Sequence, residues 1–166
     1  MNSSQQTGFT ILELMMAVAI AAVVVAIGIP NLMTFVRTDT AVTDVNRLVT
    51  GLTLARSEAA GRGVPVVVVP ISAGDWSTGW LIGTDLDGDG IFPEADDPAP
   101  YRVFEAITSA TFTDSPESVT FLPTGGVDTP VTFSLLPNYC HDSNNRRRIV
   151  SVGPAGFVDL AYGSCP

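Results

Sequence analysis

Four aspartates in one short segment have the spacing of a loop that binds calcium. Asp85, Asp87 and Asp89 stand at alternate positions, and Asp96 follows eleven positions after Asp85. Carboxylate oxygens at such intervals suit a hard cation, and a glycine after Asp89 fits the sharp turn of such a loop. Pro93 interrupts the second half, however, and a solvated hairpin connection rich in Asp and Gly has the same composition. Both interpretations stay open, and calcium is a possible cofactor only if the segment is a calcium-binding loop.

Two cysteines, Cys140 and Cys165, lie late in the chain and enclose 24 residues. In an oxidising compartment they could close one loop, which would constrain the unfolded chain by about 3 kcal/mol. Two separate buried thiols are the alternative. His141 is the single histidine, and one histidine beside one cysteine makes no metal or catalytic set. We find no nucleophile with a histidine and carboxylate and no paired metal ligands, so the chain is not predicted to be an enzyme.

The one basic cluster is Arg146, Arg147 and Arg148. A short arginine patch can bind the phosphates of DNA, but a solvated loop paired with the nearby Asp142 is the interpretation we favour. Eight arginines and no lysine oppose 17 acidic residues, for a net charge of -9. Residues 64–166 hold four of the arginines against thirteen acids, so the whole excess lies there. This balance argues against nucleic acid as a partner through general attraction.

Glu13 lies inside an apolar segment, where a carboxylate costs about 3 kcal/mol on insertion scales. No charge occurs from Leu14 to Val36, and a helix over 9–29 would be about 30 Å long, enough to span a bilayer. Either Glu13 sits near the membrane surface at the helix N-terminus, or it pairs with a cation. The nearest such cation is an amine made by cutting the chain before Phe9, on this molecule or a neighbour. We favour this pairing, which predicts that many such helices pack together.

The apolar segment is predicted to be a retained membrane span. A secretory signal would have a basic start and a shorter apolar core, whereas residues 1–8 carry no charge. The first basic residue, Arg37, follows the span, so the distribution of positive charge gives no orientation. Pro30, next to Gly28, is predicted to kink the helix because its ring removes a backbone donor and crowds the preceding turn.

After Pro30 the apolar residues become periodic, which predicts an amphipathic helix that ends near Ala60, before two glycines. Its predicted buried stripe consists of Val42, Val45, Leu48, Val49, Leu52, Ala55 and Ala59. Beyond it, short apolar and β-branched runs alternate with turn residues, which is typical of strands. We expect about seven strands, at 64–71, 79–84, 101–107, 118–122, 131–136, 147–152 and 156–162. The fold class is therefore α+β.

The N-terminal residues resemble a known processing site. The segment reads Gly8-Phe9-Thr10-Ile11-Leu12-Glu13-Leu14. It is similar to the site at which prepilin peptidase cuts type IV pilins and type II secretion pseudopilins. The resemblance implies that the peptidase cuts after Gly8 and methylates Phe9. It also implies that Glu13 is the assembly carboxylate and that Pro30 occupies the usual kink position.

Two further stretches narrow the resemblance to the minor pilins and pseudopilins of the FimT, FimU and GspH type. Residues 54–66 are similar to the junction between helix and first strand in that group. Residues 79–85 and 101–103 resemble its central hairpin. Minor pilins of this type often carry a disulfide near the C-terminus, which favours a bond between Cys140 and Cys165. Some relatives take up DNA through C-terminal arginines, but here Phe157 and Asp159 stand where we align those arginines.

The resemblance implies a type IV pilin fold, with a long kinked helix packed on a C-terminal antiparallel β-sheet domain. The expected parts are a leader over 1–8, a transmembrane helix over 9–30, an amphipathic half over 31–63 and a head over 64–166. The expected function is that of a structural minor pilin or pseudopilin in a type IV pilus, at its tip or priming complex, or in a type II secretion pseudopilus. A DNA-binding minor pilin for transformation is the alternative.

The resemblance also implies partners and a location. Other pilins or pseudopilins would bind through the N-terminal helices, and the prepilin peptidase and methyltransferase would process the chain. Before assembly the chain would cross the inner membrane once, with a periplasmic head. After assembly it would belong to the pilus or pseudopilus.

Overall fold

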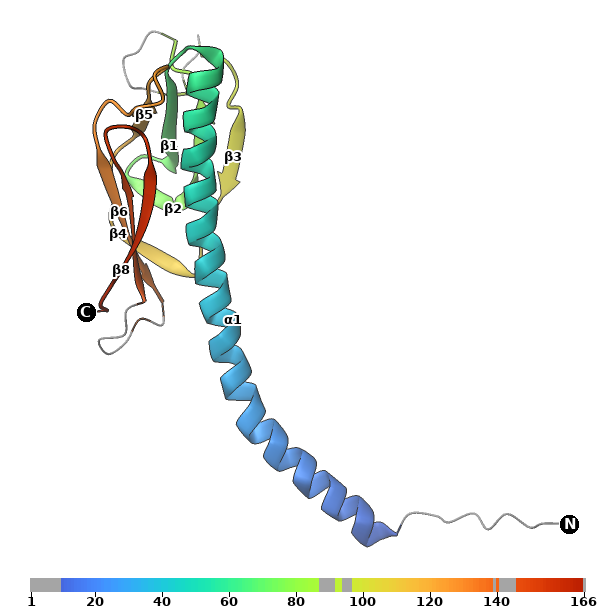
Figure 1. Ribbon diagram of the computed structural model, residues 1–166. Coiled ribbons are helices and arrows are strands. Elements are labelled where there is room, and N and C mark those ends of the chain that lie inside the picture. Colours follow the sequence, from blue (N-terminus) through green and yellow to red (C-terminus); the bar gives the residue numbers. More distant parts are fainter. Residues whose placement is uncertain (1–9, 87–91, 94–96, 139, 141–145, 166) are drawn as a thin grey trace, which may run out of the picture. The chain divides into compact units, whose positions relative to one another are not determined.

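The computed structural model describes residues 10–86, 92–93, 97–138, 140 and 146–165, with the backbone alone for residues 30–39. The described chain is one long helix followed by strands (Figure 1). The chain divides into two compact units, Met1–Asp39 and Thr40–Pro166.

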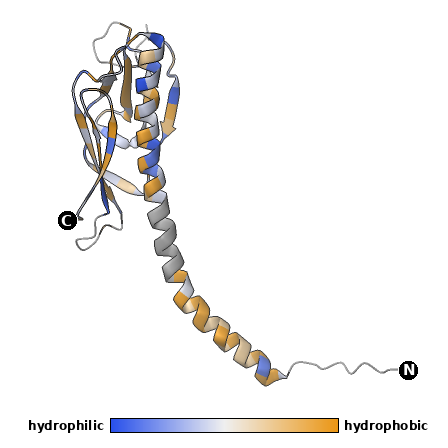
Figure 2. Cartoon of the chain, in the orientation of Figure 1, coloured by the Kyte–Doolittle hydropathy of each residue, from blue (hydrophilic) through white to orange (hydrophobic). Residues whose placement is uncertain are grey.

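The first unit contains the apolar part of the helix α1, which spans Ile11–Arg62. Its stretch Ile11–Ile29 is long and apolar enough to cross a membrane. Figure 2 shows it as mostly hydrophobic, with one hydrophilic band near its start. α1 continues through Pro30. The expected kink at this proline would set the direction of one unit relative to the other, and it stays a prediction.

The second unit contains the amphipathic part of α1, whose buried stripe is mostly the predicted one. Leu48, Leu52, Ala55 and Ala59 are fully buried. Val42, the first residue of the predicted stripe, is instead 38% exposed, and the neighbouring Ala41 is buried at the beginning of the stripe. The helix ends two residues later than expected, at Arg62, where Gly63 adopts a φ of 71° and its N–H bonds to the Ala59 carbonyl. Glycine closes a helix in this left-handed conformation without strain.

Two antiparallel four-stranded sheets follow the helix (Figure 1). The first has the order β3-β2-β1-β5 and the second the order β4-β6-β7-β8. Their strands are β1 Val66–Ser72, β2 Asp75–Gly83, β3 Arg102–Glu105, β4 Ala110–Asp114, β5 Val119–Phe121, β6 Val131–Pro137, β7 Arg147–Val152 and β8 Val158–Gly163. All seven expected segments contain a strand. β4 was not predicted, because its sequence has only two apolar residues between threonines.

The core lies between α1 and the inner faces of both sheets. The helix stripe packs in one cluster with Val66 and Val68 of the first sheet and with Phe133 and Val150 of the second. Both tryptophans of β2 are buried in the core. The Trp76 ring lies 4.8 Å from the Phe133 ring of the second sheet, so it joins the two sheets, and the Trp80 ring stacks at 5.1 Å on Phe104 of the neighbouring strand β3.

Gly51 lets α1 approach β2 closely. A Cβ at this position would lie 2.7 Å from Nε1 of Trp80 and 3.3 Å from the Phe104 ring. Both rings are packed in the core, so neither can move aside without cost. The glycine inside the helix, which lowers helix propensity, is therefore explained by the packing of the tryptophan.

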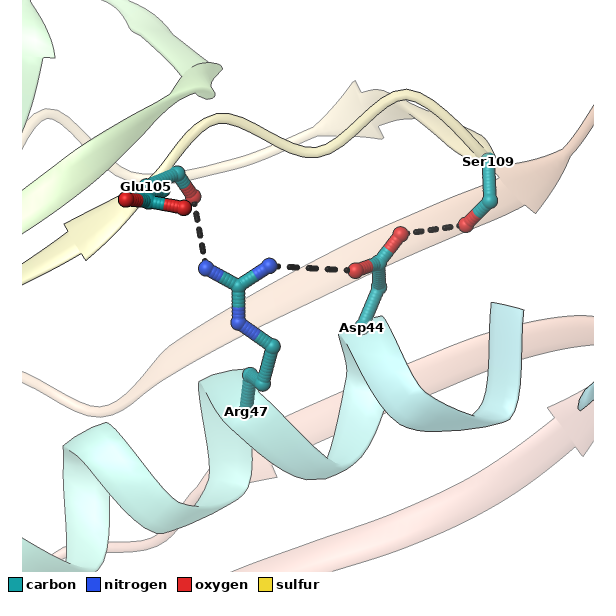
Figure 3. A network of polar contacts seen from close by, with 4 residues as sticks. All are labelled: Asp44, Arg47, Glu105 and Ser109. Carbon is teal, nitrogen blue, oxygen red and sulfur yellow. Dashed lines mark hydrogen bonds and ion pairs between the residues drawn. The ribbon is translucent and has the colours of Figure 1, made fainter. Parts of the chain in front are cut away.

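A buried carboxylate joins α1 to the connection between β3 and β4 (Figure 3). Asp44 is 5% exposed. Its Oδ2 accepts a hydrogen bond from the Ser109 hydroxyl, and its Oδ1 lies 3.4 Å from the guanidinium of Arg47. Arg47 in turn donates to the Glu105 carbonyl at 3.0 Å. The network holds both ends of the connection against the first turns of the helix that pack in the head.

We predict that Asp44→Ala destabilises the head. The substitution removes the acceptor of the Ser109 hydroxyl and the partner of Arg47, and unpaired polar groups at a partly buried site cost about 1–3 kcal/mol. The free energy of unfolding of the full chain in detergent micelles, followed by circular dichroism, should fall by that amount. Asp159→Ala removes an exposed carboxylate of β8 and should change it by less than about 0.5 kcal/mol. Equal losses in both variants would contradict a structural role for the network.

Candidate functional site

Glu13 and Thr10 form a reciprocal cap at the start of α1. The Thr10 N–H and hydroxyl both donate to Oε2 of Glu13, at 3.0 and 2.9 Å. The Glu13 N–H donates to Oγ1 of Thr10 at 3.2 Å. This is a capping box, in which the first and fourth residues satisfy each other's backbone donors. Sequence reasoning missed it, although a threonine three positions before a glutamate at the edge of an apolar run is its signal.

The cap leaves half of the Glu13 carboxylate for another partner. Both bonds from Thr10 end on Oε2, and within the described residues no hydrogen bond reaches Oε1. The first turn of a helix also favours negative charge, because its free N–H groups carry partial positive charge. The carboxylate is thus fixed in direction and presents one oxygen to its surroundings.

These surroundings are apolar side chains that the described residues of the unit leave exposed to solvent. Leu12, Leu14, Met15 and Met16 are all more than half exposed. A continuous apolar surface of this kind calls for lipid or other apolar helices. The predicted cleavage site, Gly8 and Phe9, lies outside the described residues.

Cys140 and Cys165 form the disulfide that the resemblance implied. Their Cα atoms are 5.4 Å apart and both residues are buried. The bond ties the segment after β6 to the residues after β8. The alternative of two separate thiols is therefore wrong. His141, beside Cys140, lies outside the described residues.

The predicted calcium loop is described only at its ends. Asp85 follows β2 and is 6% exposed. The Leu86 N–H donates to Oδ1 of Asp97 at 3.1 Å, which brings the two ends of the acidic segment together. Asp87, Asp89 and Asp96 lie outside the described residues. Among the residues that the structure describes, no group of three metal-ligating side chains converges, so calcium binding stays a prediction.

The arginine cluster does not form one patch in the described residues. Arg147 donates to the hydroxyls of Ser134 and Thr113, at 2.6 and 3.3 Å. Arg148 lies 4.4 Å from the Tyr162 ring. Neighbours along a strand point to opposite faces, so these two guanidinium groups lie on different sides of the second sheet. Asp142, the partner we expected for the cluster, is not described.

Two arginines of the helix have different kinds of partner. Nε of Arg56 donates to the Gly125 carbonyl at 2.9 Å, and its guanidinium packs on the Phe157 ring. Arg62 donates to the Glu58 carboxylate one turn earlier, and this hydrogen bond raises the pKa of the Arg62 guanidinium above its ordinary value. The spacing of Glu58 and Arg62 is a local pattern, whereas the partners of Arg56 are distant in sequence and no local pattern indicates them.

Two protein families match the chain, and together they span most of it. Residues 44–156 match the family described as type II transport protein GspH. Residues 3–29 match the prokaryotic N-terminal methylation motif, which includes Gly8, Phe9 and Glu13. A search among curated proteins gives no significant match.

Solved structures show the same fold. The type IV minor pilin FimU of Pseudomonas aeruginosa aligns with a TM-score of 0.55 and 24% identity, over 70% of this chain and 84% of that one. The minor pseudopilin EpsH of the Vibrio cholerae type 2 secretion system aligns with a TM-score of 0.50 and 16% identity, over 72% and 94%. The helix packed on antiparallel sheets is therefore an arrangement that pilus and secretion subunits share.

We predict that Thr10→Val loosens the first turn of α1. Valine keeps the shape of threonine but loses the hydroxyl that bonds twice with Glu13, and a lost cap costs about 1 kcal/mol. Amide exchange at Glu13 and Leu14, whose N–H groups bond to the Thr10 hydroxyl and carbonyl, should become about fivefold faster in the full chain in micelles. Thr10→Ser should restore the original rate, and Thr50→Val, at an exposed position of the same helix, should leave it unchanged. Unchanged exchange in Thr10→Val would contradict the cap.

If the acidic loop binds calcium, the ion should stabilise the full chain. Millimolar calcium acting on a site of extracellular affinity raises the free energy of unfolding by about 1–2 kcal/mol. Melting of the chain in micelles with calcium and with a chelator measures this. Asp87→Asn should abolish the difference, whereas Asp159→Asn should retain it. Identical melting under both conditions would remove calcium as a cofactor.

Proposed function

Because the chain belongs to the GspH family, among the type IV minor pilins and type II pseudopilins, we propose that its N-terminal helix assembles into a filament. The filament is either a type IV pilus or a secretion pseudopilus, since the same helix serves both. The family consists of structural subunits, and the chain is anchored in the inner membrane by its apolar helix before assembly. Prepilin peptidase would cut between Gly8 and Phe9.

The capped carboxylate of Glu13 is the observation that carries the proposal. In an apolar bundle of helices an ionised carboxylate is costly unless a cation pairs with it. Oε2 is held by Thr10, so Oε1 is the atom that meets the cation. The amine exposed by cutting before Phe9 of a neighbouring subunit has the required charge and lies at the same depth. Each subunit then offers one carboxylate and one amine, which allows the contact to repeat along a filament.

The disulfide supports a periplasmic head. Bonds between cysteines persist in oxidising compartments such as the periplasm and are rare in the cytosol. The bond between Cys140 and Cys165 lies after the membrane span, so the head and the catalysts of disulfide formation share one side of the membrane. We place the assembled subunit in the tip or priming complex, as the likeness to minor pilins favours.

The proposal does not extend to DNA capture. Arg147 is engaged with two hydroxyls and Arg148 with the Tyr162 ring, on opposite faces of the sheet. Phosphate recognition by arginine profits from several guanidinium groups on one surface. DNA binding therefore stays an untested alternative that no described contact favours.

We predict that Glu13→Gln abolishes assembly without disturbing the helix cap. Glutamine preserves the capping box but carries no charge. The full-length variant should therefore reach the membrane normally and melt like the original chain, yet appear at least about tenfold less in sheared filaments, because the amine of its neighbour is left unpaired.

Immunoblots of the membrane and sheared fractions measure this, with Glu13→Ala as the variant that loses both charge and cap. Thr10→Val keeps the charge and should assemble better than either. Assembly of Glu13→Gln at the level of the original chain would overturn the proposal.

A further inference from the structure

An open groove lies on the outer face of the first sheet, beside the hairpin that joins β1 and β2. It has a volume of about 630 Å³, and its lining includes Val69, Ile71, Phe92 and Glu117. Val66 and Val68 point into the core, so alternation along β1 places Val69 on the opposite face, away from α1. The groove is therefore on a surface that the helix leaves uncovered.

The floor and one wall of the groove are apolar and firmly packed. The Phe92 ring packs with Val67 and Val69. It lies directly over Gly83, where any Cβ would overlap it. Ile71, at the open end, is 47% exposed. The groove thus presents a preformed apolar surface.

The groove exists because β5 is shorter than its neighbour. β1 pairs with β5 only as far as Val68, opposite Val119, but β1 itself continues to Ser72. Glu117 and Ser118 precede β5 and form the facing wall. The last residues of β1 are therefore paired with β2 alone.

At Pro70, the backbone of this open edge can accept a hydrogen bond but cannot donate one. The carbonyls of Ile82 and Thr120 bond away from β1, to the N–H groups of Tyr101 and Asp128. Ile82 is paired with Val68, and its backbone groups point away from β1, so those of Val68 point to the other side, toward β5. Pro70 lies two residues further along β1, and its carbonyl therefore faces that same side. Proline has no N–H, so an added strand would find a carbonyl there and no donor.

The polar groups of the groove thus favour a cationic donor over an added strand. Glu117 is exposed, and among the described residues no ion pair involves it. Its carboxylate, the Ser118 hydroxyl and the Pro70 carbonyl can all accept, while the apolar floor suits the aliphatic part of a lysine or arginine. This combination fits a basic side chain beside an apolar residue.

Charge decides which protein supplies that side chain. Residues 64–166 hold thirteen acids against four arginines. Two heads of this sequence would repel each other, whereas a basic partner would be attracted. Resting on the proposed function, we propose that the groove binds a lysine or arginine, flanked by an apolar residue, from a neighbouring filament subunit of different sequence.

A photo-crosslinker placed at the exposed Ala73, at the end of the groove, tests this in cells that assemble the filament. The full-length chain carrying p-benzoylphenylalanine there should form an adduct with another subunit, at a peptide that contains a lysine or arginine. Glu117→Lys should lower the adduct yield about tenfold.

The matched control is Asp159→Lys, which reverses the charge of an exposed residue of β8 and should leave the adduct yield within about twofold. Exchanging the mapped basic residue of the partner for glutamate should restore the yield with Glu117→Lys.

Several results would overturn the groove as a basic-residue site. These are an adduct with a second copy of this chain, an adduct at a segment without a basic residue, equal yields in both reversal variants, and no adduct although the chain is present in sheared filaments. Glu13→Gln separates the two proposals. If this variant is excluded from filaments, and the otherwise original chain enters filaments but forms no adduct at Ala73, the assembly role stands and only the groove inference fails. If the original chain is itself absent from filaments, both fail.

Discussion

A carboxylate held at the start of an exposed apolar helix is the constraint on which the rest of the molecule depends. Thr10 fixes Glu13 through one oxygen, and the apolar side chains that follow give the helix no stable place in water. Lipid can cover those side chains but cannot neutralise the charge. Only a cation at the same depth does so, and under the function proposed above a neighbouring subunit with a newly cut terminus supplies it. Membrane anchoring and the proposed polymerisation then rest on the same few residues, because the helix would pass from one apolar surrounding to another.

The second part of α1 obeys a different constraint, since only one of its faces is apolar. Its stripe is buried against both sheets, and Gly51 allows the helix to approach Trp80 closely. Asp44, on the same part of the helix, binds the connection between β3 and β4. Packing and polar contacts together make this part of the helix a piece of the head. A single element thus serves two environments, and the change from uniform to periodic hydropathy marks where one gives way to the other.

Periodicity predicted the elements of the fold but not the contacts between them. The stripe of α1 and the seven expected strands are local patterns of side chains, and the structure confirms them with small shifts at the ends. β4 has too few apolar residues to be recognised alone, and it is a strand because it pairs with β6. Arg56 and Asp44 look like solvated charges in sequence because their partners, Gly125 and Ser109, are 69 and 65 positions away. The capping box of Thr10 and Glu13 is different, since its signal is local and was available. The groove beside Glu117 depends on where β5 begins, which no sequence pattern indicates.

The distribution of charge separates assembly from recognition. Residues 1–63 carry four arginines and four acids, so the helical part has no net charge, and the head carries the entire excess. An apolar helix with one carboxylate offers few features by which one neighbouring subunit could be distinguished from another. Selection requires features that differ between subunits, and an acidic head with an apolar groove would be such a feature. Its negative charge repels a second copy of the same head and attracts a basic partner. Under the two proposals, the helix supplies most of the cohesion, and the head determines which subunit is the neighbour.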